Sequence, residues 1–294
     1  MGASAAIETV LETNGARLAV RQVGAGHPIV VLHGGPDFDY GYLLPEIDRL
    51  AGLGQLLLYA QRGRGRSYAG EGPDDVSIES EMADLDAVRA LSGSEAVAII
   101  GHSWGGVLAM EYAVRYPERV SHLVLVGSAP ASHADALSLR SHLRSLRTPD
   151  QQDRMQELRA DGAYLAGDVD AEAELYRIHF ARALRDPADV DRVVRRLRRT
   201  FTPEAIVAAR AIEDGLYAQT WDVASYDLLP RLRTLRLPTL VVRGDHDFVP
   251  TAISAHIAEA VPDARLVVIA ECGHFVFMEQ PDAILAEIAQ LLAR

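Results

Sequence analysis

The chain has 294 residues, 49% hydrophobic and 24% charged, which is the composition of a globular protein rather than a disordered or fibrous one. Its 29 basic and 41 acidic residues give a formal net charge of −12, which disfavours nucleic acid as a partner because phosphate backbones are repelled. Every basic residue apart from histidine is an arginine, so lysine-dependent chemistry such as Schiff-base formation is excluded. The single cysteine, Cys272, excludes an internal disulfide, and we predict no metal and no organic cofactor.

We expect a cytoplasmic protein with no membrane partner. No apolar run approaches the ~20 residues that span a bilayer. The first residues lack the basic segment and apolar run of a secretory signal.

The N-terminal half alternates short apolar runs with amphipathic stretches. Asn14-Gly15 between two β-like runs predicts a tight hairpin. Helical patterns occur at about 77–92 and 104–116. Buried strands are predicted at residues 28–32, 56–59, 97–100 and 123–126.

The alternation returns near the C-terminus. Strands are predicted at 238–242 and 265–269, with helices near 251–260 and 282–293. Strands that alternate with helices predict an α/β fold with a mostly parallel central sheet and helices on both of its faces.

Residues 131–228 break this rhythm with several amphipathic helices and no strand pattern. Thr148-Pro149, Asp186-Pro187 and Thr202-Pro203 are typical helix starts. We therefore expect a helical cap at 131–228, inserted into a single core formed by residues 1–130 and 229–294.

The most informative segment is G-H-S-W-G at residues 101–105, between a predicted strand and a predicted helix. This context is typical of a nucleophile elbow, in which a strained turn lifts a serine hydroxyl into the open. The glycines are required because a Cβ at Gly101 or Gly105 would clash with neighbouring backbone. We therefore predict Ser103 as the nucleophile.

A serine nucleophile needs a base and a group that orients the base. His274 follows the last predicted strand and is the base candidate. Asp247 and Asp245 both follow the preceding strand, and Asp247 is favoured because it lies further into the loop. Asp245 is then expected to shape the turn through its own backbone.

The oxyanion of acyl transfer needs two N–H donors. One is expected from Trp104, which follows the nucleophile, and the other from Gly35 in the glycine-rich loop 33–37. Gly34 is expected to contact the substrate. His33 is interpreted as structural, bonding loop backbone.

Together these residues resemble the α/β-hydrolase superfamily over nearly the whole chain, and within it the proline iminopeptidase group of serine aminopeptidases. The similar motifs are H-G-G-P at 33–36, Q-R-G-R-G-R-S at 61–67 and G-H-S-W-G-G at 101–106. The resemblance implies a helical cap over the active site and a triad of Ser103, Asp247 and His274. It also implies removal of an N-terminal residue, often proline, from short peptides or amides.

Three positions depart from that group's pattern. Asp37 and His102 stand where the group has glycine, and Ala60 stands where it has aspartate. In such aminopeptidases acidic cap residues hold the free amine of the substrate, and the candidates are Glu204, Glu213 and Asp214. We take Glu213 as the substrate-binding acid, with Trp221 as an aromatic of the pocket.

Other functions use the same fold. A carboxylesterase or lactonase acting on neutral acyl substrates, and a C–C bond hydrolase, would share the triad. A non-catalytic ligand receptor is a further alternative. A cap carboxylate that faces an ammonium group separates the aminopeptidase from the esterase. In each enzyme the partner is a small molecule or short peptide, and the sequence predicts no particular oligomeric state.

Overall fold

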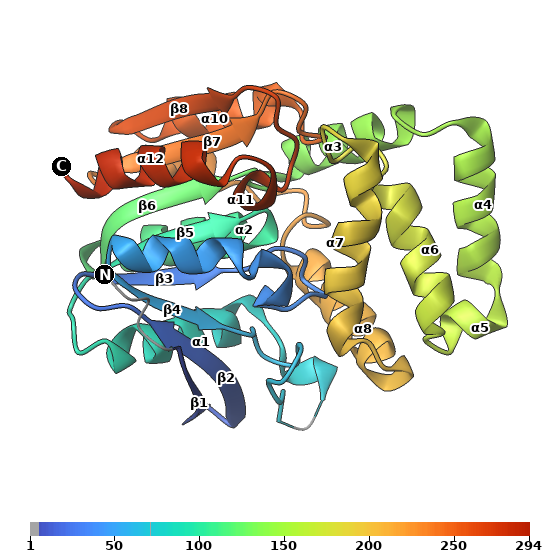
Figure 1. The fold of residues 1–294 in the computed structure, drawn as a ribbon, viewed down its shortest axis with the longest axis horizontal. Helices are drawn as coiled ribbons and strands as arrows, with labels where there is room; N and C mark the ends of the chain where they lie inside the picture. The colour runs from blue at the N-terminus through green and yellow to red at the C-terminus, as the bar shows by residue number, and fades with distance from the viewer. Residues whose placement is uncertain (1–5, 71) are drawn as a thin grey trace.

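The computed structural model describes residues 6–70 and 72–294, which form an eight-stranded sheet flanked by helices (Figure 1). The strand order is β1-β2-β4-β3-β5-β6-β7-β8, in which β1, β2 and β4 pair antiparallel and the other neighbours pair parallel. The strands are β1 (Ile7–Thr13), β2 (Ala16–Val23), β3 (Pro28–Leu32), β4 (Gln55–Tyr59), β5 (Val97–His102), β6 (Val120–Val126), β7 (Thr239–Gly244) and β8 (Ala264–Ile269). The predicted mostly parallel α/β sheet is confirmed.

The β1–β2 hairpin turns at Asn14 and Gly15, as their sequence predicted. Both residues have positive φ angles, 48° and 76°, which matches the turn type that suits the twist of a two-residue hairpin. Strands β3, β5 and β7 are buried along their whole length, because helices cover both faces of a parallel sheet.

Helices pack on the sheet in two layers. One layer brings α1 (Ile78–Leu91) against α2 (Trp104–Arg115), and the other brings α12 (Pro281–Leu292) against the 3-10 helix η2 (Glu46–Gly52). Helix α10 (Thr251–Ala260) packs on β7 and β8. Helices α1, α2, α10 and α12 lie close to the predicted ranges, since apolar periodicity locates a helix well and its ends less well. No helix was predicted at the position of η2.

Between β6 and β7 the chain is helical, and this insertion lies beyond the C-terminal ends of the strands (Figure 1). Its helices are α3 (His133–Ser145), α4 (Pro149–Ala160), α5 (Gly162–Leu165), α6 (Val169–Phe180), α7 (Val190–Leu197) and α8 (Pro203–Gln219). The short helix α9 (Leu229–Leu232) follows the insertion and packs against α10 and α2. Thr148 and Thr202 cap α4 and α8 with their side chains, whereas Asp186 starts only a short 3-10 turn at Pro187–Asp189.

Within residues 6–70 and 72–294, none of the helices combines the length and the apolar character needed to cross a membrane.

Candidate active site

Ser103 occupies a strained turn between β5 and α2. Its φ of 54° and ψ of −118° lie outside the regions that a serine ordinarily adopts. A Cβ on Gly101 would lie 2.3 Å from the carbonyl oxygen of Gly105, and one on Gly105 would lie 2.3 Å from that of Leu32. The two glycines therefore allow the close backbone approach that holds the serine at the sheet edge.

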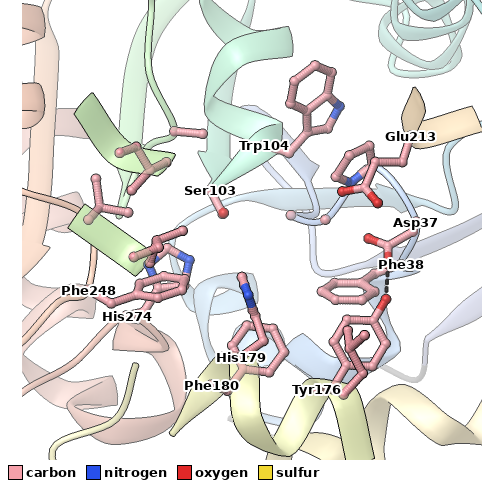
Figure 2. Close-up of a pocket in the computed structure, with 18 of the residues that line it drawn as sticks. Asp37, Phe38, Ser103, Trp104, Tyr176, His179, Phe180, Glu213, Phe248 and His274 are labelled. Atoms are coloured by element: carbon pink, nitrogen blue, oxygen red, sulfur yellow. Dashed lines mark hydrogen bonds between the residues drawn. The ribbon is translucent and has the colours of Figure 1, made fainter. Parts of the chain in front are cut away.

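His274 and Asp247 form a buried hydrogen-bonded pair beside this turn. Nδ1 of His274 lies 2.9 Å from Oδ1 of Asp247, which also accepts the N–H of Val249 at 2.9 Å. Burial by itself raises the pKa of Asp247, but the charge of His274 and these hydrogen bonds bring it below its ordinary value. Figure 2 shows the Ser103 hydroxyl and the His274 ring at the same pocket.

Asp245 was expected to shape its own turn, but its carboxylate instead forms backbone hydrogen bonds with the neighbouring loop. Its carboxylate accepts the backbone N–H groups of Glu271 and Cys272, both at 3.0 Å. The hydrogen bond from Cys272, together with His246, lowers the pKa of Asp245. Asp245 thus anchors the segment that leads from β8 to His274, two residues beyond Cys272.

The loop after β3 approaches the nucleophile closely. A Cβ on Gly34 would lie 2.8 Å from the Cβ of Ser103, and Gly35 has a φ of +62°. His33 is structural, as interpreted from the sequence: its Nε2 accepts the N–H of Gln61 at 3.0 Å, and its Nδ1 lies 3.0 Å from the carbonyl oxygen of Gly34. Burial and then the charge of Arg64 lower the pKa of His33 to about 3, so it stays neutral.

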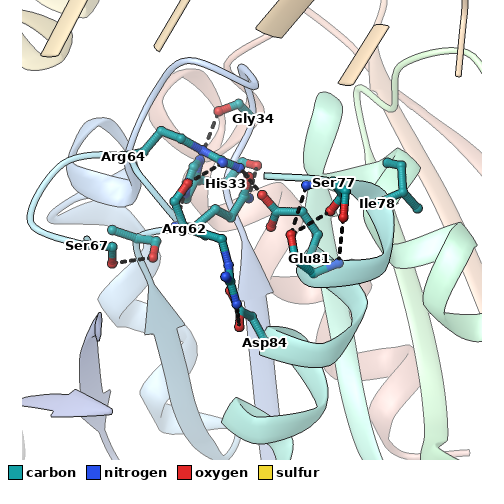
Figure 3. Close-up of polar contacts among 12 residues, drawn as sticks. His33, Gly34, Arg62, Arg64, Ser67, Ser77, Ile78, Glu81 and Asp84 are labelled. Atoms are coloured by element: carbon teal, nitrogen blue, oxygen red, sulfur yellow. Dashed lines mark hydrogen bonds and ion pairs between the residues drawn. The ribbon is translucent and has the colours of Figure 1, made fainter. Parts of the chain in front are cut away.

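A buried polar scaffold supports this loop (Figure 3). Arg64 donates to Glu81 at 2.5 Å, and Arg62 donates to Asp84 at 2.7 Å. Arg64 also donates to the side-chain oxygen of Gln61 at 2.7 Å. The arginine-rich segment at 61–67 is the loop after β4. These ion pairs therefore hold that loop against helix α1 beneath the site.

The site opens into a cavity of about 480 Å³ between the sheet edge and the helical insertion. Asp247 lies behind His274 and does not line the cavity, and Glu204 and Asp214 are exposed on α8 outside it. The other predicted site residues all line it: Gly34, Gly35, Ser103, Trp104, Glu213, Trp221 and His274. Apolar side chains line the rest, including Leu139, Leu143, Leu175, Phe180, Phe248 and Val249.

Three carboxylates on one side of the cavity form what we call the acidic wall: Asp37, Glu172 and Glu213. Asp37 accepts a hydrogen bond from the hydroxyl of Tyr176, and Glu172 pairs with Arg210. Glu213 accepts the hydroxyl of Tyr217 at 2.7 Å.

Electrostatics in the acidic wall favour protonation of two of its members. Burial and then the charge of Asp37 raise the pKa of Glu213 to about 8. Burial also raises the pKa of Asp37 to about 6, with a contribution from Glu172. Figure 2 shows the Asp37 and Glu213 side chains next to each other on the same side of the cavity. A cation bound beside them would relieve the repulsion between the two carboxylates.

Aromatic rings join the acidic wall to the serine turn. The ring of Tyr217 stacks on Trp221 with 4.8 Å between centroids, and Trp221 meets Trp104 edge-on at 5.3 Å. The indole N–H of Trp221 donates to the carbonyl oxygen of Pro130 at 3.0 Å, which holds the ring against the cavity.

Sequence reasoning missed Asp37, Glu172, Tyr176 and His179 as cavity residues. A signal existed for Asp37, because it is the last residue of the glycine-rich loop and stands where glycine is expected. The three from α6 carried no signal, since they lie in an amphipathic helix whose rotation is decided by docking.

Comparison with known proteins agrees with the fold. The model of the alpha/beta hydrolase fold matches residues 27–281. Proline iminopeptidase PfmaB of Pestalotiopsis fici is 29% identical over 97% of this chain and 99% of its own length. The proline iminopeptidase of Saccharolobus solfataricus is 27% identical over 92% of this chain and 86% of its own length. The structure of 2-hydroxy-6-oxo-6-phenylhexa-2,4-dienoate hydrolase from Rhodococcus sp. strain RHA1 superposes with a TM-score of 0.76 at 21% identity, covering 99% of this chain and 100% of that one.

Proposed function

Because this chain belongs to the α/β-hydrolase family and is a hydrolase similar to proline iminopeptidases, we propose that it is a serine aminopeptidase. It removes an N-terminal residue, proline foremost, from short peptides or amides. The reacting groups are Ser103, His274 and Asp247, and the helical insertion at 131–228 is the cap that covers them.

In this mechanism His274 takes the proton of the Ser103 hydroxyl through Nε2, while Asp247 holds Nδ1 and so fixes the imidazole tautomer. The alkoxide attacks the carbonyl carbon of the scissile amide. The N–H groups of Gly35 and Trp104 bind the oxyanion that forms. His274 then protonates the leaving amine, and water releases the acyl group from Ser103 by the reverse sequence.

The observation that carries this proposal is the acidic wall. Burial and the charge of Asp37 raise the pKa of Glu213, and burial and the charge of Glu172 raise the pKa of Asp37. A bound ammonium group would therefore stabilise the ionised form of both carboxylates. The ring contact between Tyr217 and Trp104, 5.7 Å between centroids, ties Glu213 to the residue that follows the nucleophile. A substrate amine held there places the adjacent carbonyl near Ser103.

The test compares prolyl p-nitroanilide with p-nitrophenyl butyrate, which has no amine. We expect Glu213→Gln to lower kcat/KM for the anilide at least tenfold and to change ester hydrolysis far less. Asp214→Asn is the matched control, because this adjacent acid on α8 is exposed and lies outside the cavity. Equal losses on both substrates, or equal losses in both variants, would contradict the proposed amine site.

The apolar part of the cavity favours a second candidate function, a carboxylesterase or lactonase that acts on neutral acyl groups. Leu139, Leu143, Phe180 and Phe248 offer such a group a dry surface. Hydrolysis of the butyrate ester without any cleavage of the anilide, both blank in Ser103→Ala, would establish this alternative.

A further inference from the structure

A second charged region lines the cavity and has opposite sign. Arg144 on α3, Arg147 after it and Arg159 on α4 line the cavity, and we call them the arginine cluster. Within the part of the chain that the structure describes, no carboxylate pairs with any of the three. The cavity's other arginines are both paired, Arg140 with Asp222 at 2.7 Å and Arg210 with Glu172.

Two members of the arginine cluster, Arg144 and Arg159, are exposed. Arg147 is half-buried, and burial together with the charges of Arg159 and Arg144 lowers its pKa. The charges of Arg144 and Arg159 therefore repel the guanidinium group of Arg147. A ligand anion among them would remove that repulsion and form charge-assisted hydrogen bonds.

Contacts place Arg147 on the side of the catalytic base. Arg147 donates to Nδ1 of His179 at 3.3 Å. The His179 ring lies 5.5 Å from that of Phe248, which lies 4.5 Å from that of His274. Burial and the charge of Arg147 lower the pKa of His179 to about 3, so this histidine is a neutral acceptor and adds no charge.

The acidic wall reaches the reacting centre by a different route, through Tyr217 and Trp104 on the side of the expected oxyanion donors. The two charged regions therefore flank the serine differently. The acidic wall lies where the acyl part of the substrate would bind. Arg147 lies on the side where His274 would release the leaving group.

We infer that the arginine cluster binds the C-terminal carboxylate of a short peptide, so that the cavity selects unblocked dipeptides or tripeptides. This inference rests on the proposed aminopeptidase function. The amine of such a zwitterion meets the acidic wall, its scissile carbonyl meets Ser103, and its carboxylate extends past His274 to the arginines. The opposite charges at the two ends also fix the direction in which the peptide binds.

The experiment measures kcat/KM for Pro-Gly, Pro-Gly-Gly and Pro-Gly-Gly-Gly, each as the free acid and as the C-terminal amide. We expect the acid to exceed the amide by roughly tenfold at one of the two shorter lengths, as charge-assisted hydrogen bonds to a carboxylate predict. The ratio of acid to amide should fall toward one in an Arg147→Gln, Arg159→Gln double variant and in high salt. Arg195→Gln is the control, because this exposed arginine on α7 lies outside the cavity and its loss should leave the ratio as it is.

The outcomes separate the two proposals. A ratio of one at every length in the unaltered protein, or the same fall in the ratio in Arg195→Gln, would overturn the carboxylate site alone. Cleavage of neither acids nor amides, with p-nitrophenyl butyrate still hydrolysed, would overturn the aminopeptidase proposal and this inference with it.

Discussion

His102 Nε2 lies 3.0 Å from the backbone carbonyl oxygen of His274, so the residue before the nucleophile holds the loop that carries the base. The other ring nitrogen of His102 lies 2.6 Å from the hydroxyl of Tyr42, which accepts the N–H of Gly34 at 2.7 Å. Burial and the charge of His274 lower the pKa of His102 to about 3, so the ring is neutral and has one donor and one acceptor. One hydrogen-bonded chain therefore links the glycine-rich loop, the serine turn and the histidine loop.

This series of hydrogen bonds predicts that Tyr42 is a positioning residue. Tyr42→Phe leaves the N–H of Gly34 and Nδ1 of His102 without their partner, at a cost of about 1–3 kcal/mol. We expect kcat to fall roughly tenfold and KM to change little, measured on whichever substrate the protein turns over. Tyr112→Phe is the matched control, since it removes a hydroxyl that donates to Asp86 at 2.6 Å away from the cavity. Equal kcat values in the two variants would contradict the role given to Tyr42.

The buried ion pair under the site should be a strong determinant of stability. Glu81→Gln leaves the buried guanidinium of Arg64 without its carboxylate, and breaking such a pair costs about 3–5 kcal/mol. Urea denaturation should report that loss. Glu79→Gln on the same helix removes only an exposed partner of Arg115 and should cost less than about 1 kcal/mol. Similar losses for the two variants would show that the buried pair contributes little.

Stability should depend on pH through Glu213. Its pKa in the folded protein is raised to about 8 from an ordinary value of 4.5, so the unfolded chain releases this proton at lower pH. Between these values the folded state binds more protons, and stability due to this group is present at low pH and lost as pH rises toward 8. Glu213→Gln should therefore gain Tm relative to the unaltered protein at pH 8 and gain little at pH 4.5. A Tm difference that does not change with pH would contradict the raised pKa.

The ionisation of Glu213 should also affect activity. It lowers stability as pH rises, but it should raise activity on a substrate that carries an amine. Ammonium binding needs Glu213 deprotonated, so kcat/KM for prolyl p-nitroanilide divided by that for the butyrate ester should rise with pH up to about 8. Both reactions use His274 as the base, so its titration cancels in the ratio. Because the ester lacks an amine, only the anilide should depend on the ionisation of Glu213. Below pH 8 a flat ratio, or a rise that persists in Glu213→Gln, would contradict this assignment.

Most of the fold and the centre of the site follow from local sequence. Continuous apolar runs predicted the parallel strands, and the glycines around Ser103 predicted a turn in which no Cβ fits at Gly101 or Gly105. Loops after parallel strands meet at one edge of a sheet, so His274 and Asp247 were expected to lie close to the serine. The structure shows a hydrogen bond of 2.9 Å between these two side chains, and His274 lines the same cavity as Ser103.

The residues that line the cavity could not be predicted from local sequence, because they depend on how the helices of the insertion dock on the sheet. Glu204 and Glu213 are nine residues apart, which at about 100° per residue places them on opposite faces of α8. Periodicity can separate the two faces, yet it does not tell which of them meets the cavity. Asp37 and Tyr176 are likewise 139 residues apart in the chain, and only the tertiary fold brings them together.

The most direct measurement is covalent labelling of the protein with a fluorophosphonate, followed by mass spectrometry of its peptides. We predict a single adduct on Ser103, absent from Ser103→Ala and strongly slowed in His274→Ala, with circular dichroism showing that both variants remain folded. An adduct at another residue, or undiminished labelling of folded Ser103→Ala, would contradict the assignment of Ser103 as the nucleophile.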